Sequence, residues 1–194
     1  MVSKNTARIV RFLLRSIEKI GYNINQIAKA VKISVGSSFN ILKSLEKNKI
    51  VIANPIGNAL YYALNLENLE TIKLCELFLL EEKRNLKGYA KLYAESLQNF
   101  EKAEMIVLFG SILSNKEFND VDVLFITDKV KDVNTFCLEL SKMRTKPVVP
   151  LILKKNDFIR ELKDKKDVIV SIIKNGVVLK GESVFLGIIK NAKK

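Results

Sequence analysis

The sequence contains no histidine and only two cysteines, and these shortages narrow the chemistry that the chain can perform. Without histidine, the chain cannot use a serine–histidine or cysteine–histidine nucleophile, and it cannot bind a metal through imidazole. Cys75 and Cys137 lie far apart and form no spaced cluster, which argues against a disulfide framework and against a zinc site. Any catalysis must therefore depend on carboxylates, lysines, hydroxyl groups and a hard metal ion. The low cysteine content also makes a reducing cytoplasm the expected location.

Long apolar runs are also missing. No segment approaches the roughly 20 apolar residues that a membrane span needs, and the N-terminus lacks a charged-then-apolar signal pattern, so we expect no membrane partner. With 48% hydrophobic and 28% charged residues, the composition is ordinary for a globular protein. The 194 residues allow one domain or two small ones.

The net charge of +12 is unevenly distributed along the chain. Residues 1–60 carry ten Lys/Arg against two Glu, whereas residues 61–100 carry five against six and residues 101–194 carry eighteen against thirteen. The excess at the N-terminus favours a polyanionic partner there, although a lysine-rich surface that only faces solvent would give the same charge.

Two short apolar runs, residues 106–109 and residues 121–126, form the centre of the sequence. Because each run is short and flanked by polar residues, each predicts a buried strand. Gly110 and Ser111 follow the first run, and Asp120 and Asp122 stand at the start of the second. Side chains two residues apart share one face of a strand, so we expect the two carboxylates to point to one place and the valines at 121 and 123 to face the other way.

These end residues predict a site for a metal-bound nucleoside triphosphate. Two neighbouring carboxylates repel each other, and a divalent cation such as Mg²⁺ or Mn²⁺ relieves that repulsion. Gly110 allows a ligand to approach the backbone, and a helix that starts after Ser111 would present free N–H groups to a phosphate. The alternative is a pair of solvated aspartates at a strand edge in an unrelated α/β domain.

The order Gly110-Ser111, eight residues, then Asp120-Val121-Asp122 resembles the signature of the DNA polymerase beta nucleotidyltransferase superfamily, and above all its small stand-alone members, the minimal nucleotidyltransferases. The resemblance covers residues 104–190, including the segment Asn-Gly-Val-Val-Leu-Lys-Gly before a terminal helix. It implies that Asp120 and Asp122 hold the metal and are catalytic, and that Gly110 and Ser111 hold the phosphates.

The sequence departs from this family at two places. The family's loop between Gly-Ser and the first aspartate usually carries a basic residue followed by glycine, and here Lys116 is the candidate for that nucleotide-binding role. The family places a third metal carboxylate on the strand after the next helix, but that strand, residues 147–153, holds no acid. Asp157 lies just beyond it, and we expect it to cap a helix. This departure leaves enzymatic activity an open question.

Apolar spacing predicts three helices near the N-terminus. The first covers residues 6–20 and is stopped by Gly21; the second begins at a cap, Asn25; the third runs from its cap Ser34 to residue 47. In the third helix, Val35, Phe39, Leu42 and Leu45 are expected to point inward. Its outer face is expected to carry the DNA-binding side chains Ser37, Asn40, Lys43 and Lys47.

A hairpin follows, with its turn at residues 54–58. Three helices and a hairpin resemble the winged helix-turn-helix family, whose last helix enters the major groove of double-stranded DNA. A winged helix used only for protein contacts is the alternative. This predicts a DNA-binding domain at residues 1–66. Residues 67–101 are expected to form a helical connector that breaks near Gly88 and could pair in a homodimer, as such helices often do in that family.

Residues 102–194 complete the expected α/β (α+β) fold: a winged helix-turn-helix, a helical connector and a nucleotidyltransferase-like mixed sheet with flanking helices. Two functions remain open. The chain is either a nucleotidyltransferase that binds a metal–triphosphate and transfers a nucleotidyl group to an acceptor, or a DNA-binding transcriptional regulator whose nucleotidyltransferase-like domain is inactive. Pro150 predicts an edge strand or a bulge, and Gly176 predicts the end of a helix.

Overall fold

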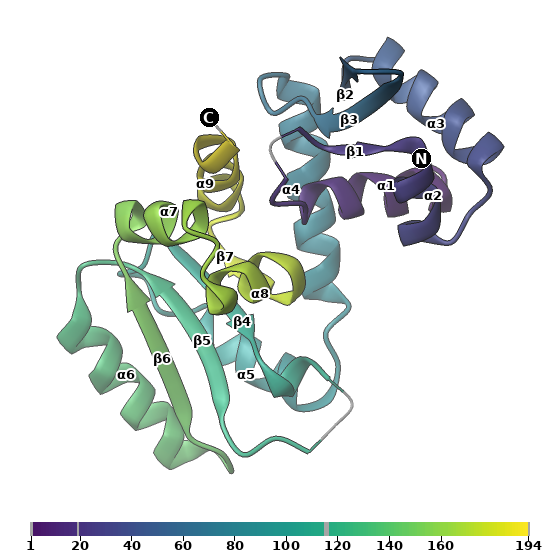
Figure 1. Ribbon diagram of the computed structural model, residues 1–194. Coiled ribbons are helices and arrows are strands. Elements are labelled where there is room, and N and C mark those ends of the chain that lie inside the picture. Colours follow the sequence, from purple (N-terminus) through teal and green to yellow (C-terminus); the bar gives the residue numbers. More distant parts are fainter. Residues whose placement is uncertain (1, 19, 115–116, 194) are drawn as a thin grey trace. The chain divides into compact units, whose positions relative to one another are not determined.

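The computed structural model describes residues 2–18, 20–114 and 117–193, which form two compact units (Figure 1). The first unit extends to Phe78 and also contains Lys193, and the second is Leu79–Ala192. The division falls inside one helix, within the segment that the sequence marks as a connector. In the described part of the chain, no helix is both long and apolar enough to cross a membrane.

The first unit consists of helices packed against a small antiparallel sheet. Its elements in chain order are α1 (Lys4–Leu14), β1 (Tyr22–Asn23), α2 (Ile24–Val31), α3 (Val35–Lys47), β2 (Val51–Ile56), β3 (Ala59–Leu64) and the first part of α4 (Leu69–Arg84). The strand order is β1-β3-β2. Fully buried apolar side chains from each of the first three helices form its core: Ile9, Leu13, Ile27 and Leu42.

The first helix is shorter than its apolar spacing predicts. It ends at Leu14, and Ile20 is 54% exposed. The reason is Ser16, which is buried and whose hydroxyl accepts a hydrogen bond from the Glu18 N–H (3.2 Å). A serine that bonds its own neighbouring backbone competes with the helical ladder. Gly21 is therefore not the helix stop; its φ is +93°, and a Cβ there would overlap the Tyr62 carbonyl.

The cap of α2 is Asn23 rather than Asn25. The Asn23 side chain accepts a hydrogen bond from the Gln26 N–H (3.0 Å), and the Gln26 side chain accepts one from the Asn23 N–H (2.9 Å). This reciprocal pair satisfies two of the unpaired N–H groups at the helix start. The apolar pattern could not distinguish the two asparagines, because both precede the same buried residues.

The ends of α3 are confirmed, but two of its side chains face differently from the prediction. Ser34 is the cap, and its hydroxyl accepts a hydrogen bond from the Ser37 N–H (3.1 Å). Val35 and Phe39 were expected inside, yet they are 48% and 49% exposed. The buried stripe of α3 runs through Ser38, Leu42 and Leu45.

The hairpin turn is tighter than predicted. It contains only Gly57 and Asn58, because β2 continues to Ile56 and Pro55 pairs with Leu60. β2 lies at the edge of the sheet, where a proline costs no inner ladder bond.

The second unit is a mixed four-stranded sheet with helices on both faces (Figure 1). Its strand order is β6-β5-β4-β7; β4 is antiparallel to β5 and β7, and β5 is parallel to β6. After the end of α4, its elements are α5 (Gly88–Leu97), β4 (Met105–Phe109), the 3₁₀ turn η1 (Ser111–Leu113), β5 (Val121–Ile126), α6 (Val130–Met143), β6 (Val148–Leu153), α7 (Lys155–Lys163), α8 (Asp167–Asn175), β7 (Val177–Lys180) and α9 (Glu182–Lys193).

Several predicted boundaries in this unit are confirmed. The connector breaks before Gly88, which begins α5 with φ +53°. Gly176 follows the last residue of α8. Pro150 lies in β6, which is an edge strand.

One face of the sheet packs against α5 and α6 in a single apolar cluster, which includes Val121, Val123 and Tyr93. The Tyr93 hydroxyl donates to the Lys146 carbonyl oxygen (2.8 Å) and accepts from the Lys146 N–H (3.0 Å). This buried tyrosine therefore ties α5 to the chain that enters β6. On the other face, Gly176 at the end of α8 lies against Val107 of β4.

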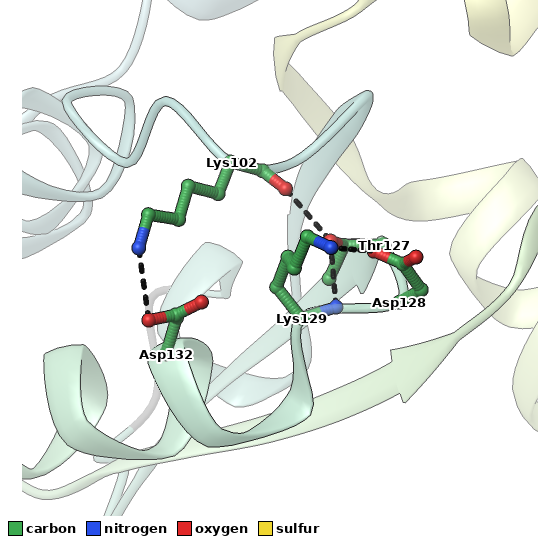
Figure 2. A network of polar contacts seen from close by, with 5 residues as sticks. All are labelled: Lys102, Thr127, Asp128, Lys129 and Asp132. Carbon is green, nitrogen blue, oxygen red and sulfur yellow. Dashed lines mark hydrogen bonds and ion pairs between the residues drawn. The ribbon is translucent and has the colours of Figure 1, made fainter.

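A polar network fixes the C-terminal end of β5 (Figure 2). The Thr127 hydroxyl donates to the Lys102 carbonyl oxygen (2.7 Å) and accepts from the Lys129 N–H (3.1 Å). The ammonium of Lys102 pairs with Asp132 (2.9 Å), and that of Lys129 pairs with Asp128 (3.3 Å). The network joins the start of α6 to the chain that enters β4.

Candidate functional site

Antiparallel pairing places the Gly110-Ser111 segment beside the start of β5. Phe109, the last residue of β4, is in register with Asp122. Gly110 follows with φ +81°, and a Cβ at that position would overlap the Asp122 carboxylate oxygen Oδ2. The backbone conformation and the close carboxylate both require glycine here.

Asp120 and Asp122 form the electrostatic centre of this site. Val121 and Val123 are fully buried in the cluster on the opposite face of β5, whereas Asp122 is partly exposed. Burial, and then the nearby charge of Asp120, raise the pKa of Asp122. Two carboxylates that repel each other in this way form a site that suits a divalent cation, because the cation removes the repulsion.

Ser111 begins a short 3₁₀ turn rather than the α-helix that the phosphate prediction assumed. The turn is closed by the Ser114 N–H, which donates to the Ser111 carbonyl oxygen (2.9 Å), and by the Ser114 hydroxyl, which donates to the same oxygen (2.7 Å). The first N–H groups of such a turn have no acceptor inside it. They remain suited to an anion, but without the dipole of a long helix.

No third carboxylate joins the pair among the described residues. No group of three or more His, Cys, Asp or Glu side chains in that part of the chain could hold a metal. On the neighbouring strand β6, the residue in register with Asp122 is Val149, which is 45% exposed. An apolar side chain thus stands beside the carboxylates.

Asp157 cannot supply the missing group. It lies in the first turn of α7, where the cap is Lys154 rather than Asp157, and its carboxylate pairs with Arg160 (2.8 Å). Leu153, where β6 ends, is four residue steps after Val149, a distance of about 13 Å along the strand. Asp157 therefore lies near the opposite end of the sheet from Asp122.

The other predicted site residues, apart from Lys116, lie on α3 of the first unit. Asn40, Lys43 and Lys47 are exposed on α3, and Ser37 is partly exposed there. Lys116 lies outside the described residues.

Most of the second unit matches a known protein family. Residues 91–184 match the family model of polymerase beta nucleotidyltransferases, described as "Polymerase beta, Nucleotidyltransferase". This segment is therefore similar to the nucleotidyltransferase domain of that family. The match begins in α5 and ends in α9, so it contains both aspartates and the Gly110-Ser111 segment. Searches of curated proteins and of solved structures found no match.

The sequence did not predict the positions of two residues, Val149 and Phe39. Val149 becomes relevant only through its register with Asp122, and register between strands separated by a whole helix leaves no local trace. Phe39 fits a helical apolar period and was therefore predicted inside. The polar residue at the next buried position, Ser38, was the available sign that the buried face had been placed incorrectly.

Proposed function

We propose that the nucleotidyltransferase-like domain binds a divalent cation together with a nucleoside triphosphate. Asp120 and Asp122 would hold the cation, and Gly110 and Ser111 would hold the terminal phosphates. The close approach of Asp122 to Gly110 is the observation that supports this proposal, because an Asp122 carboxylate oxygen lies against the Gly110-Ser111 segment. The bound cation would neutralise the phosphate oxygens.

We infer that nucleotidyl transfer by this chain alone is slow or absent. In such a transfer, an acceptor hydroxyl oxygen bonds to the α-phosphorus, pyrophosphate leaves, and the hydroxyl proton goes to a base. The aspartate pair can hold one cation, whereas two-metal chemistry needs a further anionic ligand. Val149 lies beside the pair, and Asp157 lies beyond the far end of β6, which is about 13 Å along the strand from Val149. A partner that supplies the missing group would restore transfer.

Calorimetry with Mg²⁺ or Mn²⁺ and a non-hydrolysable triphosphate tests the binding site. Asp122→Asn should abolish the metal-dependent binding. Asp128→Asn is the matched control, because Asp128 is an exposed aspartate at the other end of β5 and should leave binding unchanged. Equal binding by both variants and the unchanged protein would reject this site.

Labelled triphosphates, incubated with the protein alone and with cell extract, test the transfer. We expect label to reach an acceptor only when extract is present. Robust transfer by the purified protein would show that the aspartate pair suffices, or that a ligand outside this group completes the site.

We also propose that the first unit binds double-stranded DNA. The order of α1, α2, α3 and a β2–β3 hairpin supports a winged helix-turn-helix, and the excess of Lys/Arg over residues 1–60 supports a polyanionic partner. The exposed face of α3 carries Asn40, Lys43, Ser44 and Lys47, with Glu46 as a carboxylate among them.

A duplex titration at several salt concentrations tests this binding. Affinity should fall steeply with salt, because neutralised phosphates release counterions. Lys43→Ala should weaken binding to every sequence and lower the salt slope by about one ion. Lys174→Ala, in α8 of the second unit, is the control of equal charge. Absence of binding at about 50 mM salt would reject a DNA function.

A regulator with an inactive nucleotidyltransferase-like domain is the second candidate function, and Val149 beside the aspartates is the observation that favours it.

We also propose that the chain forms a homodimer through α4. Leu69 and Leu77 are 67% and 46% exposed on that helix. Light scattering of Leu69→Glu beside the unchanged protein tests it, and an unchanged mass would reject this interface.

A further inference from the structure

The exposed face of α3 combines an aromatic side chain with an amide and two ammonium groups. Phe39 is 49% exposed and precedes Asn40, which is also exposed. The Lys43 ammonium lies 6.0 Å from the Phe39 ring centroid, and Lys47 is exposed one turn further along. The same helix thus buries a serine, Ser38, and leaves a phenylalanine exposed.

We propose that Phe39 and Asn40 recognise A·T base pairs through the major groove of DNA. Phe39 contacts the C5 methyl group of a thymine, and Asn40 forms two hydrogen bonds with N6 and N7 of an adenine. These are the contacts that an exposed aromatic ring and a side-chain amide make with base edges, and only the major groove displays both groups. The inference rests on the proposed DNA binding and adds the base preference.

The charges around Phe39 favour DNA as the occupant of this face. Lys43 and Lys47 lie on the same exposed side of α3, where their ammonium groups can reach DNA phosphates beside the groove. The unit that carries them has a large excess of basic residues over residues 1–60. A second copy of this chain would bring the same ammonium groups against these, which opposes pairing through α3.

Selection from a random duplex library with the full chain, followed by chemical editing of the selected site, tests this proposal. Replacing a contacted thymine by uracil removes only the methyl group, and it should weaken binding about fourfold, the worth of one buried methyl. Phe39→Ala should bind the thymine site more weakly and lose the response to uracil. Ile20→Ala is the control, since it shortens another exposed apolar side chain of the first unit, outside α3, α4 and the hairpin.

A second comparison, with an edited adenine in place of the edited thymine, tests Asn40. Replacing the contacted adenine by 7-deazaadenine removes the N7 acceptor, which should weaken the unchanged protein and leave Asn40→Ala unaffected. Melting curves of the variants should match that of the unchanged protein, because Phe39 and Asn40 are exposed and outside the core.

The outcomes separate this inference from the proposed DNA binding. Binding with no enrichment of A·T pairs, or a uracil penalty that persists in Phe39→Ala, overturns the base preference and leaves DNA binding intact. A Phe39→Ala variant that changes only the mass in solution overturns it in favour of a protein contact. Failure to bind any duplex at about 50 mM salt removes both.

Discussion

Gly110 is the residue on which the candidate site depends most directly. We expect Gly110→Ala to destabilise the second unit by about 1–3 kcal/mol and to abolish metal–triphosphate binding. A side chain is strained at φ +81°, and the added Cβ would also displace the Asp122 carboxylate. Urea denaturation and calorimetry measure the two effects.

Gly187→Ala is the matched control for that substitution. Gly187 lies inside α9 with open space around it, so alanine there should raise stability by about 0.5–1 kcal/mol and leave binding unchanged. If Gly110→Ala and Gly187→Ala change stability and metal–triphosphate binding alike, the site does not depend on the close approach of Gly110 and Asp122.

Val149 gives a gain-of-function prediction. Its position in register with Asp122 on a parallel strand puts a new carboxylate within reach of the aspartate pair. We expect Val149→Asp to raise the affinity for Mg²⁺ on the order of tenfold, because an added anionic ligand strengthens a hard-cation site. Val130→Asp, at an exposed valine beyond the other end of β5, is the control for charge. Equal gains in both variants would mean that the added negative charge raises the Mg²⁺ affinity wherever it is placed.

At the residue scale, the sequence could predict what depends on neighbours along the chain. Gly110 and Asp122 stand at the ends of apolar runs, so both strands and the face of the carboxylate follow from local alternation. The pairing of Asp122 with Val149 depends on how α6 returns the chain, which no residue near either position encodes. Gly110 and Asp122 were therefore predictable as site residues. For the strand 147–153, the sequence showed that no acid is present, but not that Val149 is the side chain beside Asp122.

Among the elements, β5 is held at its far end by Thr127. We expect Thr127→Val, which keeps the shape but loses the hydroxyl, to lower the free energy of unfolding by about 1–3 kcal/mol. The Lys102 carbonyl and the Lys129 N–H would both lose their partner (Figure 2). Thr127→Ser keeps both hydrogen bonds and should cost less. Metal binding should persist in both variants, since Asp122 lies at the other end of β5.

The ends of elements show where prediction from sequence stops. Helical spacing gave the existence of α1 and α3, because an apolar stripe is a property of many residues together. It placed the end of α1 too late, since a single hydrogen bond from the Glu18 N–H to the Ser16 hydroxyl decides that end. Caps and turns depend on individual side chains, and the apolar period does not record them.

Across the whole molecule, pH should change stability through a few buried or half-buried groups. Burial lowers the pKa of Lys193 to about 8, partly offset by the charges of Cys75 and Glu18. Burial also raises the pKa of Cys75 to about 12 and that of Cys137 to about 11. A lowered lysine pKa makes the unfolded chain hold the proton more tightly, so stability rises with pH above about 8. A raised thiol pKa has the opposite effect above about 9.

We therefore expect the melting temperature to rise between about pH 8 and pH 9 and then to fall as the two thiols ionise in the unfolded chain. The free energy of unfolding should increase by no more than about 1 kcal/mol over that range, because one proton contributes at most about 1.4 kcal/mol per pH unit. Lys193→Met should be more stable than the unchanged protein at pH 7 and should lack the rise. Lys190→Met, in the same helix, is the control. A rise that survives in Lys193→Met would assign it to another group.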